Sequence, residues 1–317
     1  MATVLVGNLI EKLMSNRARE AILVPGAPPT LRRGKEFIPI SAEKLTPDDV
    51  RQVLINLRAR SVRINSPLEE AGHFSFGVSG VGRFRVSYVT QRGSYAVFLH
   101  VVEEKTPSLW DLVPDDDVRS VLQEVQNLQN GLIFITGPYT ICNTDLAGAL
   151  LLEILTNRAA VIYTLEQPQA YSLRHNRSIV VQREVGSDVP DFAEGIADAL
   201  KIAADVIYIG DIPDTKTAEA ALRAVESGRL IIITYPSGGI VAGLISLERY
   251  FADPITMRQS LAHTLYGIFS PSPLTTGESP ALAMEWLLRD DEITRMIEDG
   301  NFTEMEKRIK TTSRLTA

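Results

Sequence analysis

The sequence predicts an α/β protein in which a smaller domain with an antiparallel sheet precedes a larger domain with a mainly parallel sheet. Strand-like runs follow one another between glycine turns in the first third of the chain, whereas apolar strands alternate with amphipathic helices from Asp115 onward. The chain has 317 residues, of which 45% are hydrophobic and 22% charged, so it is long enough for two separate cores.

The first domain is expected to span residues 1–104. Apolar residues at helical spacing predict a helix over Val4–Arg19, and a short strand over Ile22–Val24 ends at Pro-Gly and Pro-Pro turns. Thr46 followed by proline is typical of a helix start, so a second helix is expected there. The three strand-like runs that follow are His73–Val78, Arg83–Thr90 and Tyr95–Val102.

The stretch Glu103–Ser108 is polar and contains a proline, which places the predicted linker at residues 105–116. Residues 117–317 form the predicted second domain. All-apolar strands with helices between them indicate a parallel sheet that is covered on both faces. The predicted elements are helix Val118–Gln129, strand Leu132–Thr136, helix Thr144–Thr156, strand Ala160–Leu165, helix Phe192–Ala203, strand Val206–Gly210, helix Thr215–Ser227 and strand Leu230–Thr234. The region 254–317 is expected to be mainly helical, with a loop at 271–280.

Composition restricts the classes of partner. The formal net charge is −7 and no dense Lys/Arg stripe is present, so no nucleic-acid partner is expected. No apolar run is long enough for a membrane span and no signal peptide is evident, which predicts a cytoplasmic protein without membrane insertion. The single cysteine, Cys142, excludes an internal disulfide, and the four histidines lack the spacing of metal ligands.

One stretch, Gly131–Leu155, has the order of elements in which a phosphate-binding loop is found: an apolar strand, a turn opening on Gly-Pro, and a helix. Such a loop follows the pattern G-x-x-x-x-G-K-[ST]. Gly137 and Thr144 fit its first and last positions, whereas Cys142 replaces the second glycine and Asn143 the lysine. Because the lysine brings positive charge to the terminal phosphates, its loss is expected to lower triphosphate affinity by up to about a thousandfold.

The same residues have a simpler interpretation as a helix start. Asn143, Thr144 and Asp145 are all residue types that cap helices, and this role is favoured for them. Thr144 also keeps the hydroxyl that holds Mg²⁺ in phosphate-binding loops. Cys142, near a predicted helix N-terminus, raises the idea of a redox-sensing thiol with a lowered pKa, although simple replacement of a small residue is favoured.

Five further segments, together with this loop, resemble the PilT/PilU branch of the type II/IV secretion ATPases, the hexameric motors that retract type IV pili in twitching motility. They occur in the family's order across nearly the whole chain: Pro25–Arg32, Arg83–Gly93, Val161–Pro168, Asp205–Asp214 and Gly228–Ser237. The resemblance implies a PAS-like N-terminal domain, a RecA-like P-loop domain with a helical C-terminal tail, ATP with Mg²⁺ as ligands, and a homohexamer.

The resemblance also implies roles for single residues. Glu166 matches the carboxylate of the family's acidic box, although Gln167 replaces the aspartate that follows it. Asp211 stands where the Walker B segment carries glutamate; it is one methylene shorter, and a misplacement of about 1 Å costs about a hundredfold in rate. Pro236 replaces the histidine of the family's His box and has no proton to donate.

Three arginines of the first domain match those that the family directs at the nucleotide of a neighbouring subunit. They are Arg83, Arg85 and Arg92. An arginine in such a place stabilises the charge that develops during phosphoryl transfer. An alternating strand face with solvated charges is an equally favoured interpretation.

Several residues that the family uses for ATP hydrolysis are replaced in this sequence, whereas the strand and helix patterns are kept. The leading hypothesis is therefore a pseudo-ATPase. Such a protein is impaired in ATP binding and hydrolysis and acts as a regulatory or structural subunit, bound to itself or to an active PilT-type motor, peripherally at the pilus platform of the inner membrane. The alternative is a weak or partner-activated hexameric ATPase that powers pilus retraction, in which Glu166, Asp211 and Thr144 still form a site. A third hypothesis is a remodelled pocket for another small molecule.

Overall fold

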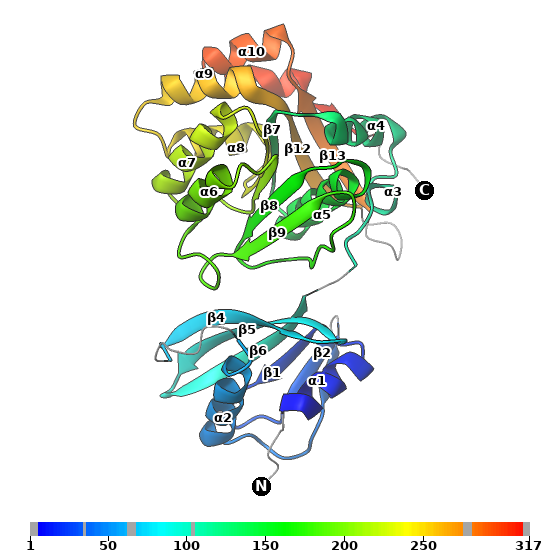
Figure 1. Cartoon of the computed structure of the whole chain (residues 1–317), viewed down its shortest axis with the longest axis vertical. Coiled ribbons are helices and arrows are strands. Elements are labelled where there is room, and N and C mark those ends of the chain that lie inside the picture. Colours follow the sequence, from blue (N-terminus) through cyan, green and yellow to red (C-terminus); the bar gives the residue numbers. More distant parts are fainter. Residues whose placement is uncertain (1–5, 34–35, 62–67, 103–104, 275–280, 313–317) are drawn as a thin grey trace. The chain divides into compact units, whose positions relative to one another are not determined.

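The computed structural model describes residues 6–33, 36–61, 68–102, 105–274 and 281–312. The chain divides into two compact units, Met1–Glu104 (unit 1) and Lys105–Ala317 (unit 2), each of which is described here by itself (Figure 1). No helix within the described ranges is long and apolar enough to cross a membrane.

Unit 1 is a six-stranded antiparallel sheet with two helices packed on one face. The strand order is β3-β2-β1-β6-β5-β4. The elements are α1 (Val6–Ser15), β1 (Glu20–Leu23), β2 (Thr30–Arg33), β3 (Glu36–Pro39), α2 (Pro47–Arg58), β4 (Ala71–Val78), β5 (Gly82–Gln91) and β6 (Ser94–Val102). Leu13 of α1 and Leu54 of α2 share one core with Phe84 and Leu99 of the sheet, all fully buried. The predicted antiparallel sheet is confirmed.

The start of α2 is fixed by reciprocal hydrogen bonds. The Thr46 hydroxyl accepts from the Asp49 backbone N–H at 3.1 Å, and the Asp49 carboxylate accepts from the Thr46 N–H at 2.8 Å. Pro47 occupies the first helical position, where no N–H donor is needed. The hydrogen bonds from Thr46 lower the pKa of Asp49. This capping box confirms the helix start predicted at Thr46.

Unit 2 is built on an eight-stranded sheet in the order β14-β13-β12-β7-β11-β10-β8-β9. It is parallel from β12 to β9, with β13 and β14 antiparallel at one edge. The strands are β7 (Gly131–Gly137), β8 (Val161–Glu166), β9 (Ile179–Glu184), β10 (Val206–Ile209), β11 (Leu230–Pro236), β12 (Leu265–Pro273), β13 (Leu282–Leu288) and β14 (Lys310–Thr311). A mainly parallel sheet was predicted, and this is confirmed.

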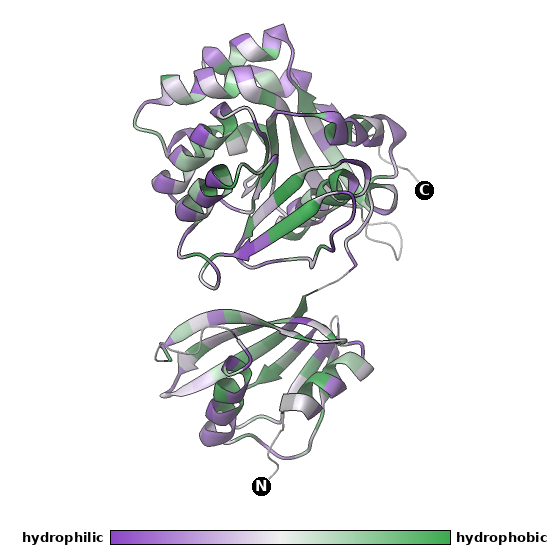
Figure 2. Cartoon of the chain, in the orientation of Figure 1, coloured by the Kyte–Doolittle hydropathy of each residue, from purple (hydrophilic) through white to green (hydrophobic). Residues whose placement is uncertain are grey.

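Helices cover both faces of this sheet. One core is formed with α3 (Leu109–Leu112), α4 (Asp116–Glu124) and α5 (Thr140–Asn157). The other is formed with α6 (Phe192–Lys201), α7 (Thr215–Glu226), α8 (Ile240–Glu248), α9 (Pro254–Thr264) and α10 (Asp291–Glu298). Short 3₁₀ turns, η1 (Val125–Asn127) and η2 (Phe302–Arg308), follow α4 and α10. Figure 2 shows the apolar strands between helices whose outer faces are hydrophilic.

The C-terminal part of the chain differs from the sequence expectation. The region 254–317 is not mainly helical, because β12, β13 and β14 all lie in it. The run Leu265–Phe269 pairs in parallel with β7 in the middle of the sheet. A short apolar run has no periodicity that separates a buried strand from a buried helix, so tertiary pairing decides its structure. The predicted loop at 271–280 begins inside β12, and residues 275–280 lie outside the described residues.

The two edges of the large sheet are short or blocked. At one edge, β14 contributes only Lys310–Thr311. At the other edge, the chain's own side chains accept hydrogen bonds from outward-facing N–H groups of β9: His175 Nδ1 from Val180 at 3.1 Å, and the Asp188 carboxylate from Glu184 at 2.9 Å. Open strand edges pair with other chains, so these contacts leave less of β9 available for pairing.

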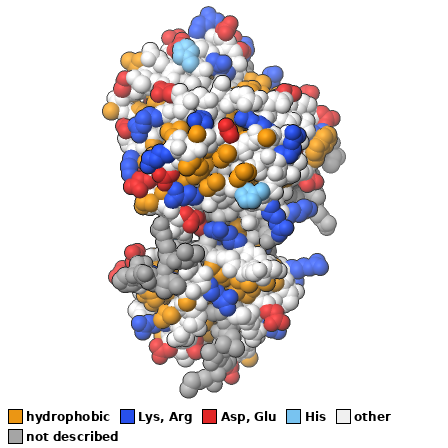
Figure 3. All heavy atoms as spheres, in the orientation of Figure 1, with side chains coloured by type: hydrophobic (Ala, Val, Ile, Leu, Met, Phe, Trp, Pro, Cys, Tyr) orange, Lys and Arg blue, Asp and Glu red, His pale blue; other side chains and the backbone are white. Residues whose placement is uncertain are grey.

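Charged side chains of both signs are interspersed on the face of the molecule seen in Figure 3. Exposed ion pairs of unit 2 include Lys216 with Asp191 at 2.8 Å and Lys201 with Asp198 at 3.2 Å. Exposed pairs of this kind contribute little to stability.

Replacing Thr46 by Ala removes the side-chain half of the capping box. We expect the T46A substitution to lower the free energy of unfolding of unit 1 by about 1 kcal/mol, because an orphan N–H of the first helical turn loses its acceptor. Urea unfolding followed by circular dichroism measures this. Thr303→Ala, at an exposed position of η2, is the control and leaves the midpoint unchanged.

Candidate functional site at the start of helix α5

The turn between β7 and α5 is shorter than a phosphate-binding loop requires. Only Pro138 and Tyr139 separate Gly137 from the first residue of α5, Thr140, and no side chain caps the helix. The Asn143 N–H already donates to the Tyr139 carbonyl at 3.1 Å. Backbone N–H groups from Asn143 onward therefore belong to the helix and not to a cradle for phosphates.

The predicted helix start at Thr144, with Asn143, Thr144 or Asp145 as caps, is thus wrong, because the helix begins at Thr140. The reason is local. None of the residues from Thr140 to Asn143 is a glycine, so nothing there favours the non-helical conformations that a phosphate loop needs, and the chain continues as helix. The Thr144 hydroxyl donates back to the Thr140 carbonyl at 2.9 Å and caps nothing.

Asn143, at the lysine position of the loop pattern, points into the protein. It is 1% exposed, and its amide nitrogen donates to the Gly137 carbonyl at 3.1 Å. A side chain at Gly137 would be crowded, since an added Cβ would lie 3.2 Å from Asn143 Oδ1 and from the Pro271 carbonyl oxygen. Ser237 N–H donates to the same Gly137 carbonyl at 3.2 Å, so the turn is held from two sides.

Cys142 is also buried and belongs to the core between α5 and the sheet. Burial, and secondly the Asp145 charge, raise the pKa of its thiol. The idea of a thiol with a lowered pKa is therefore wrong for this conformation, because the favourable helix N-terminus is outweighed by loss of solvent.

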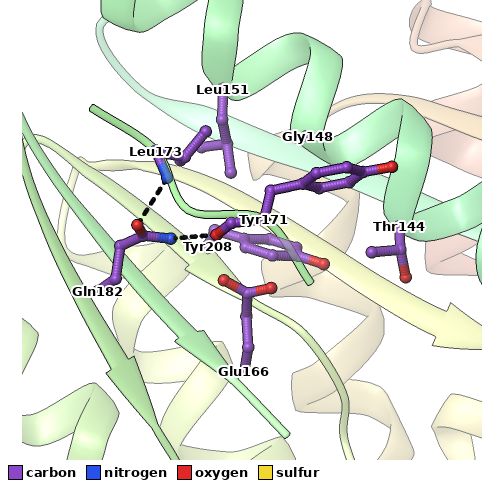
Figure 4. Close-up of a pocket in the computed structure, with 8 residues that line it drawn as sticks. All are labelled: Thr144, Gly148, Leu151, Glu166, Tyr171, Leu173, Gln182 and Tyr208. Atoms are coloured by element: carbon purple, nitrogen blue, oxygen red, sulfur yellow. Dashed lines mark hydrogen bonds between the residues drawn. The ribbon is translucent and has the colours of Figure 1, made fainter. Parts of the chain in front are cut away.

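A small hollow lies between α5 and the carboxyl ends of β8, β9 and β10, the end of a parallel sheet where ligands usually bind (Figure 4). Of the residues that sequence analysis selected, it brings together Thr144 and Glu166. The full lining is Thr144, Gly148, Leu151, Glu166, Tyr171, Leu173, Gln182 and Tyr208. Gly137, Cys142, Asn143, Asp211 and Pro236 do not line it.

Glu166 ends β8 and is 6% exposed. One carboxylate oxygen accepts from the Thr164 hydroxyl at 3.1 Å, and the other accepts from the Ala170 N–H at 3.0 Å. On the neighbouring strand, Glu184 lies directly beside Glu166 in the pairing register and is fully buried. Glu166 is therefore engaged by its own chain on both oxygens.

Asp211 follows β10, and its carboxylate accepts from the Ile212 N–H at 2.8 Å. Burial raises the pKa of Asp211. On the strand itself, Tyr208 is 3% exposed, and its hydroxyl lies 3.1 Å from the Thr234 hydroxyl, which donates to the Gly210 carbonyl at 2.7 Å. Burial, with the nearby Glu166 charge as a second cause, raises the pKa of Tyr208 well above its usual range. Tyr208 thus remains a neutral phenol beside Glu166.

Pro236 is exposed at the end of β11, opposite Gly137 in the register of β7. It offers no hydrogen-bond donor. The polar group nearest in sequence is Ser237, whose hydroxyl lies 2.6 Å from the Thr136 hydroxyl. The end of β11 therefore satisfies its polar groups within the chain.

The three selected arginines lie in unit 1. Arg83 and Arg85 alternate along β5 with the fully buried Phe84 and Val86, so they project from the opposite face of the sheet. Arg92 is exposed in the turn after β5, with φ of 48°. The alternating strand face is present. A role at a nucleotide stays a prediction.

Arg85 belongs to a charged cluster on this face. Arg32 Nε lies 2.6 Å from a carboxylate oxygen of Glu20, and His100 Nδ1 lies 3.3 Å from the other oxygen. Burial, followed by the charges of Arg85 and Arg32, lowers the pKa of His100 to about 4. His100 is therefore neutral at pH 7, and its contact with Glu20 is a hydrogen bond and not an ion pair.

Six residues that line the hollow were not predicted from the sequence: Gly148, Leu151, Tyr171, Leu173, Gln182 and Tyr208. Two of them left a signal in the sequence. Tyr208 places a phenol in the otherwise aliphatic strand Val206–Ile209, and Gly148 interrupts an apolar helix, which costs helix propensity and usually has a packing reason. No group of three or more metal-ligating side chains occurs among the described residues.

A mainly parallel sheet with helices on both faces and a hollow at the carboxyl ends of its strands is typical of α/β proteins that bind ligands at this end of the sheet. The family described as type II/IV secretion system protein matches residues 56–268, and the chain belongs to this family. A solved structure of the pilus retraction motor PilT with bound ADP superimposes with a TM-score of 0.82, at 31% identity over 94% of this chain and 87% of PilT.

Other relatives support the same family assignment. The chain is 24% identical over 306 residues to the type IV pilus ATPase PilU of Pseudomonas aeruginosa, which covers 95% of this chain and 79% of PilU. It is 26% identical to the retraction ATPase PilT of the same organism over 93% of this chain and 85% of PilT. The ATPase DotB of Legionella pneumophila shares the fold, with a TM-score of 0.79 at 18% identity over 98% of this chain and 89% of DotB.

We expect Cys142 to resist alkylation, because its thiol is buried and its raised pKa leaves little thiolate at pH 7.5. Under native conditions iodoacetamide should label it at least about a hundredfold more slowly than a cysteine placed at the exposed position 140 by Thr140→Cys in a Cys142→Ala background. Equal rates would contradict the buried position.

The N143A substitution removes the hydrogen bond to Gly137 and leaves the turn without one of its two donors. We expect a loss of about 1–3 kcal/mol in the free energy of unfolding of unit 2, measured by urea unfolding, since the Gly137 carbonyl is buried. Asn157→Ala, at the exposed end of the same helix, is the control.

Proposed function

We propose that this chain is a member of the type II/IV secretion family that has lost ATP turnover and serves a type IV pilus or a related secretion machinery by binding. The observation that carries the proposal is the early start of α5 at Thr140, which leaves Asn143 buried and bonded to the Gly137 carbonyl. A phosphate loop depends on a run of free backbone N–H groups and a lysine at this place.

Charge supports the same proposal. Of the described residues that line the hollow, none is Lys or Arg, and the carboxylates of Glu166 and Asp145 lie close to it. A triphosphate entering there would meet these carboxylates, and the described residues that line the hollow bring no positive charge to it. Two unit charges 4 Å apart interact by about 4 kcal/mol at an effective dielectric of 20, which is enough to remove useful affinity.

In this proposal the selected residues occupy the family's positions but have lost the family's chemistry. Glu166 and Asp211 are vestigial catalytic carboxylates. The vestigial P-loop consists of Gly137, Cys142, Asn143 and Thr144, and Thr144 is also the vestigial Mg²⁺ ligand. Arg83, Arg85 and Arg92 are the candidate contacts to an anionic ligand of a second copy. The proposed domains are residues 1–104 and 117–317, joined by residues 105–116.

The type of machinery comes from the relatives. PilT is named a pilus retraction motor and its structure holds ADP, and PilU is named a type IV pilus ATPase. By likeness, we propose that this chain forms a homohexamer or joins a ring with an active PilT-type motor at the inner-membrane pilus platform. A site without ATP turnover fits a subunit that regulates the motor and does not itself hydrolyse ATP.

Calorimetric titration of the purified chain with ATP and ADP in the presence of Mg²⁺, together with phosphate release, tests the loss of turnover. We expect no binding at millimolar nucleotide and no release above background. The double substitution Cys142→Gly and Asn143→Lys restores the loop pattern and is expected to raise nucleotide affinity by at least about tenfold. Micromolar binding with Mg²⁺-dependent turnover by the natural sequence would refute the proposal.

A second candidate, a partner-activated ATPase, is favoured by one observation: Thr144 and Glu166 line the same hollow. Here an active PilT-type motor would supply the missing groups in a mixed ring. We then expect hydrolysis above the sum of the separate proteins on mixing, and loss of that gain on Glu166→Gln. Glu219→Gln, at an exposed position of α7, is the control and retains the gain.

A further inference from the structure

The segment that joins β8 to β9 crosses the face of α5 beside Glu166. We propose that Tyr171 and Asp145 form a clasp that keeps residues 167–173, the strap, closed over Glu166. The conformation of the site is then governed by opening of the strap. The inference rests on the proposed function in one respect: a site that has lost nucleotide turnover needs another device to fix its conformation.

The clasp itself joins the strap to the second turn of α5. The Tyr171 hydroxyl donates to the Asp145 carboxylate, and the Tyr171 ring lies on Gly148. An added Cβ at position 148 would lie 3.0 Å from Cδ2 and 3.1 Å from Cε2 of that ring. Glycine in the middle of a helix is unfavourable relative to alanine. At position 148 this loss of helix propensity leaves space for the Tyr171 ring to pack against the helix.

The strap backbone is held by side chains from both strands that it connects (Figure 4). Ala170 N–H donates to Glu166, and Leu173 N–H donates to Gln182 Oε1 at 2.8 Å. The Tyr171 carbonyl accepts from Gln182 Nε2 at 3.0 Å and from Gln169 Nε2 at 2.9 Å, and Gln169 is 2% exposed. The strap is therefore an ordered closure with its own anchors on β8, β9 and α5.

Glu166 acts as a positioning residue in this arrangement. While the strap is closed, one of its oxygens accepts from Ala170 of the strap and the other from Thr164. Opening the strap withdraws the Ala170 donor, so the hydrogen bonding of the buried Glu166 carboxylate changes. The closed strap therefore determines which groups can form hydrogen bonds with Glu166.

The beginning of unit 2 also lies over Gly148. Thr106 lies where the chain enters this unit and is 9% exposed, and its methyl group is 3.2 Å from the position of an added Cβ at Gly148. Thr106 and the Tyr171 ring thus pack over the same glycine. A partner that displaces the beginning of unit 2 would disturb the packing of the Tyr171 ring on Gly148. Binding of such a partner would thereby change the opening of the strap.

Hydrogen–deuterium exchange on the full chain without nucleotide tests the clasp from its two sides. Tyr171→Phe removes the hydroxyl and keeps the ring, whereas Gly148→Ala displaces the ring and favours the helix. In both variants we expect amides of residues 167–176 to exchange about tenfold to a hundredfold faster, while exchange in β7, β10 and β11 stays unchanged. Asp145→Asn keeps a neutral acceptor and is expected to give an intermediate rate.

The controls are matched in chemistry. Tyr139→Phe removes the hydroxyl of an exposed tyrosine at the start of α5, and Gly7→Ala adds a methyl group to a helical glycine with nothing within 4 Å. Neither should change exchange in the strap. Unchanged strap exchange in both clasp variants overturns the proposal, and so does equal acceleration throughout unit 2. Failure of the proposed function appears separately, as ATP turnover by the natural sequence.

Discussion

The candidate site depends on the carbonyl of Gly137. It accepts from the Asn143 side chain at 3.1 Å and from the Ser237 N–H at 3.2 Å, and it lies at the end of the central strand β7. These bonds hold the chain in a turn of two residues, so α5 begins at Thr140. A buried carbonyl with two donors is costly to release, because both donors and the acceptor would lose partners. The short turn is therefore a stable feature of the fold.

The other polar groups at this edge of the sheet also pair with one another. Tyr208 and Thr234 lead to the Gly210 carbonyl, Thr136 pairs with Ser237, and Glu166 accepts from Thr164 and Ala170. These bonds are made within the chain, and paired polar groups make one conformation well defined. Among the described residues the pairing is incomplete, because the side-chain oxygens Asn143 Oδ1 and Gln169 Oε1 are buried without a hydrogen-bond partner. A buried acceptor without a donor costs free energy, so this edge is held by its paired groups at the cost of these two oxygens.

Much of the architecture could be predicted from the sequence. Helix starts with a strong local code, such as Thr46 at α2, and the apolar strands β7, β8, β10 and β11 lie within one to two residues of their expected bounds. The failures have two causes: the early start of α5 is local, because no glycine lies between Thr140 and Asn143, and the others depend on contacts between residues that only the fold brings together. The strands β9 and β12 carry no periodicity of their own, and the inward turn of Asn143 follows from Gly137 and its neighbours in space. The strap could not be predicted from the sequence, because Tyr171 contacts Asp145 and Gly148 only in the folded chain.

The blocked edge of β9 has a consequence for how this protein meets other chains. His175 and Asp188 take the outward N–H groups of Val180 and Glu184, and β14 at the opposite edge is only Lys310–Thr311. Two main-chain donors of β9 are thus already used within the chain and cannot pair with an incoming strand. At the β9 edge we therefore expect a partner to be recognised through side-chain surfaces and their shape, which makes recognition there selective for the partner's sequence.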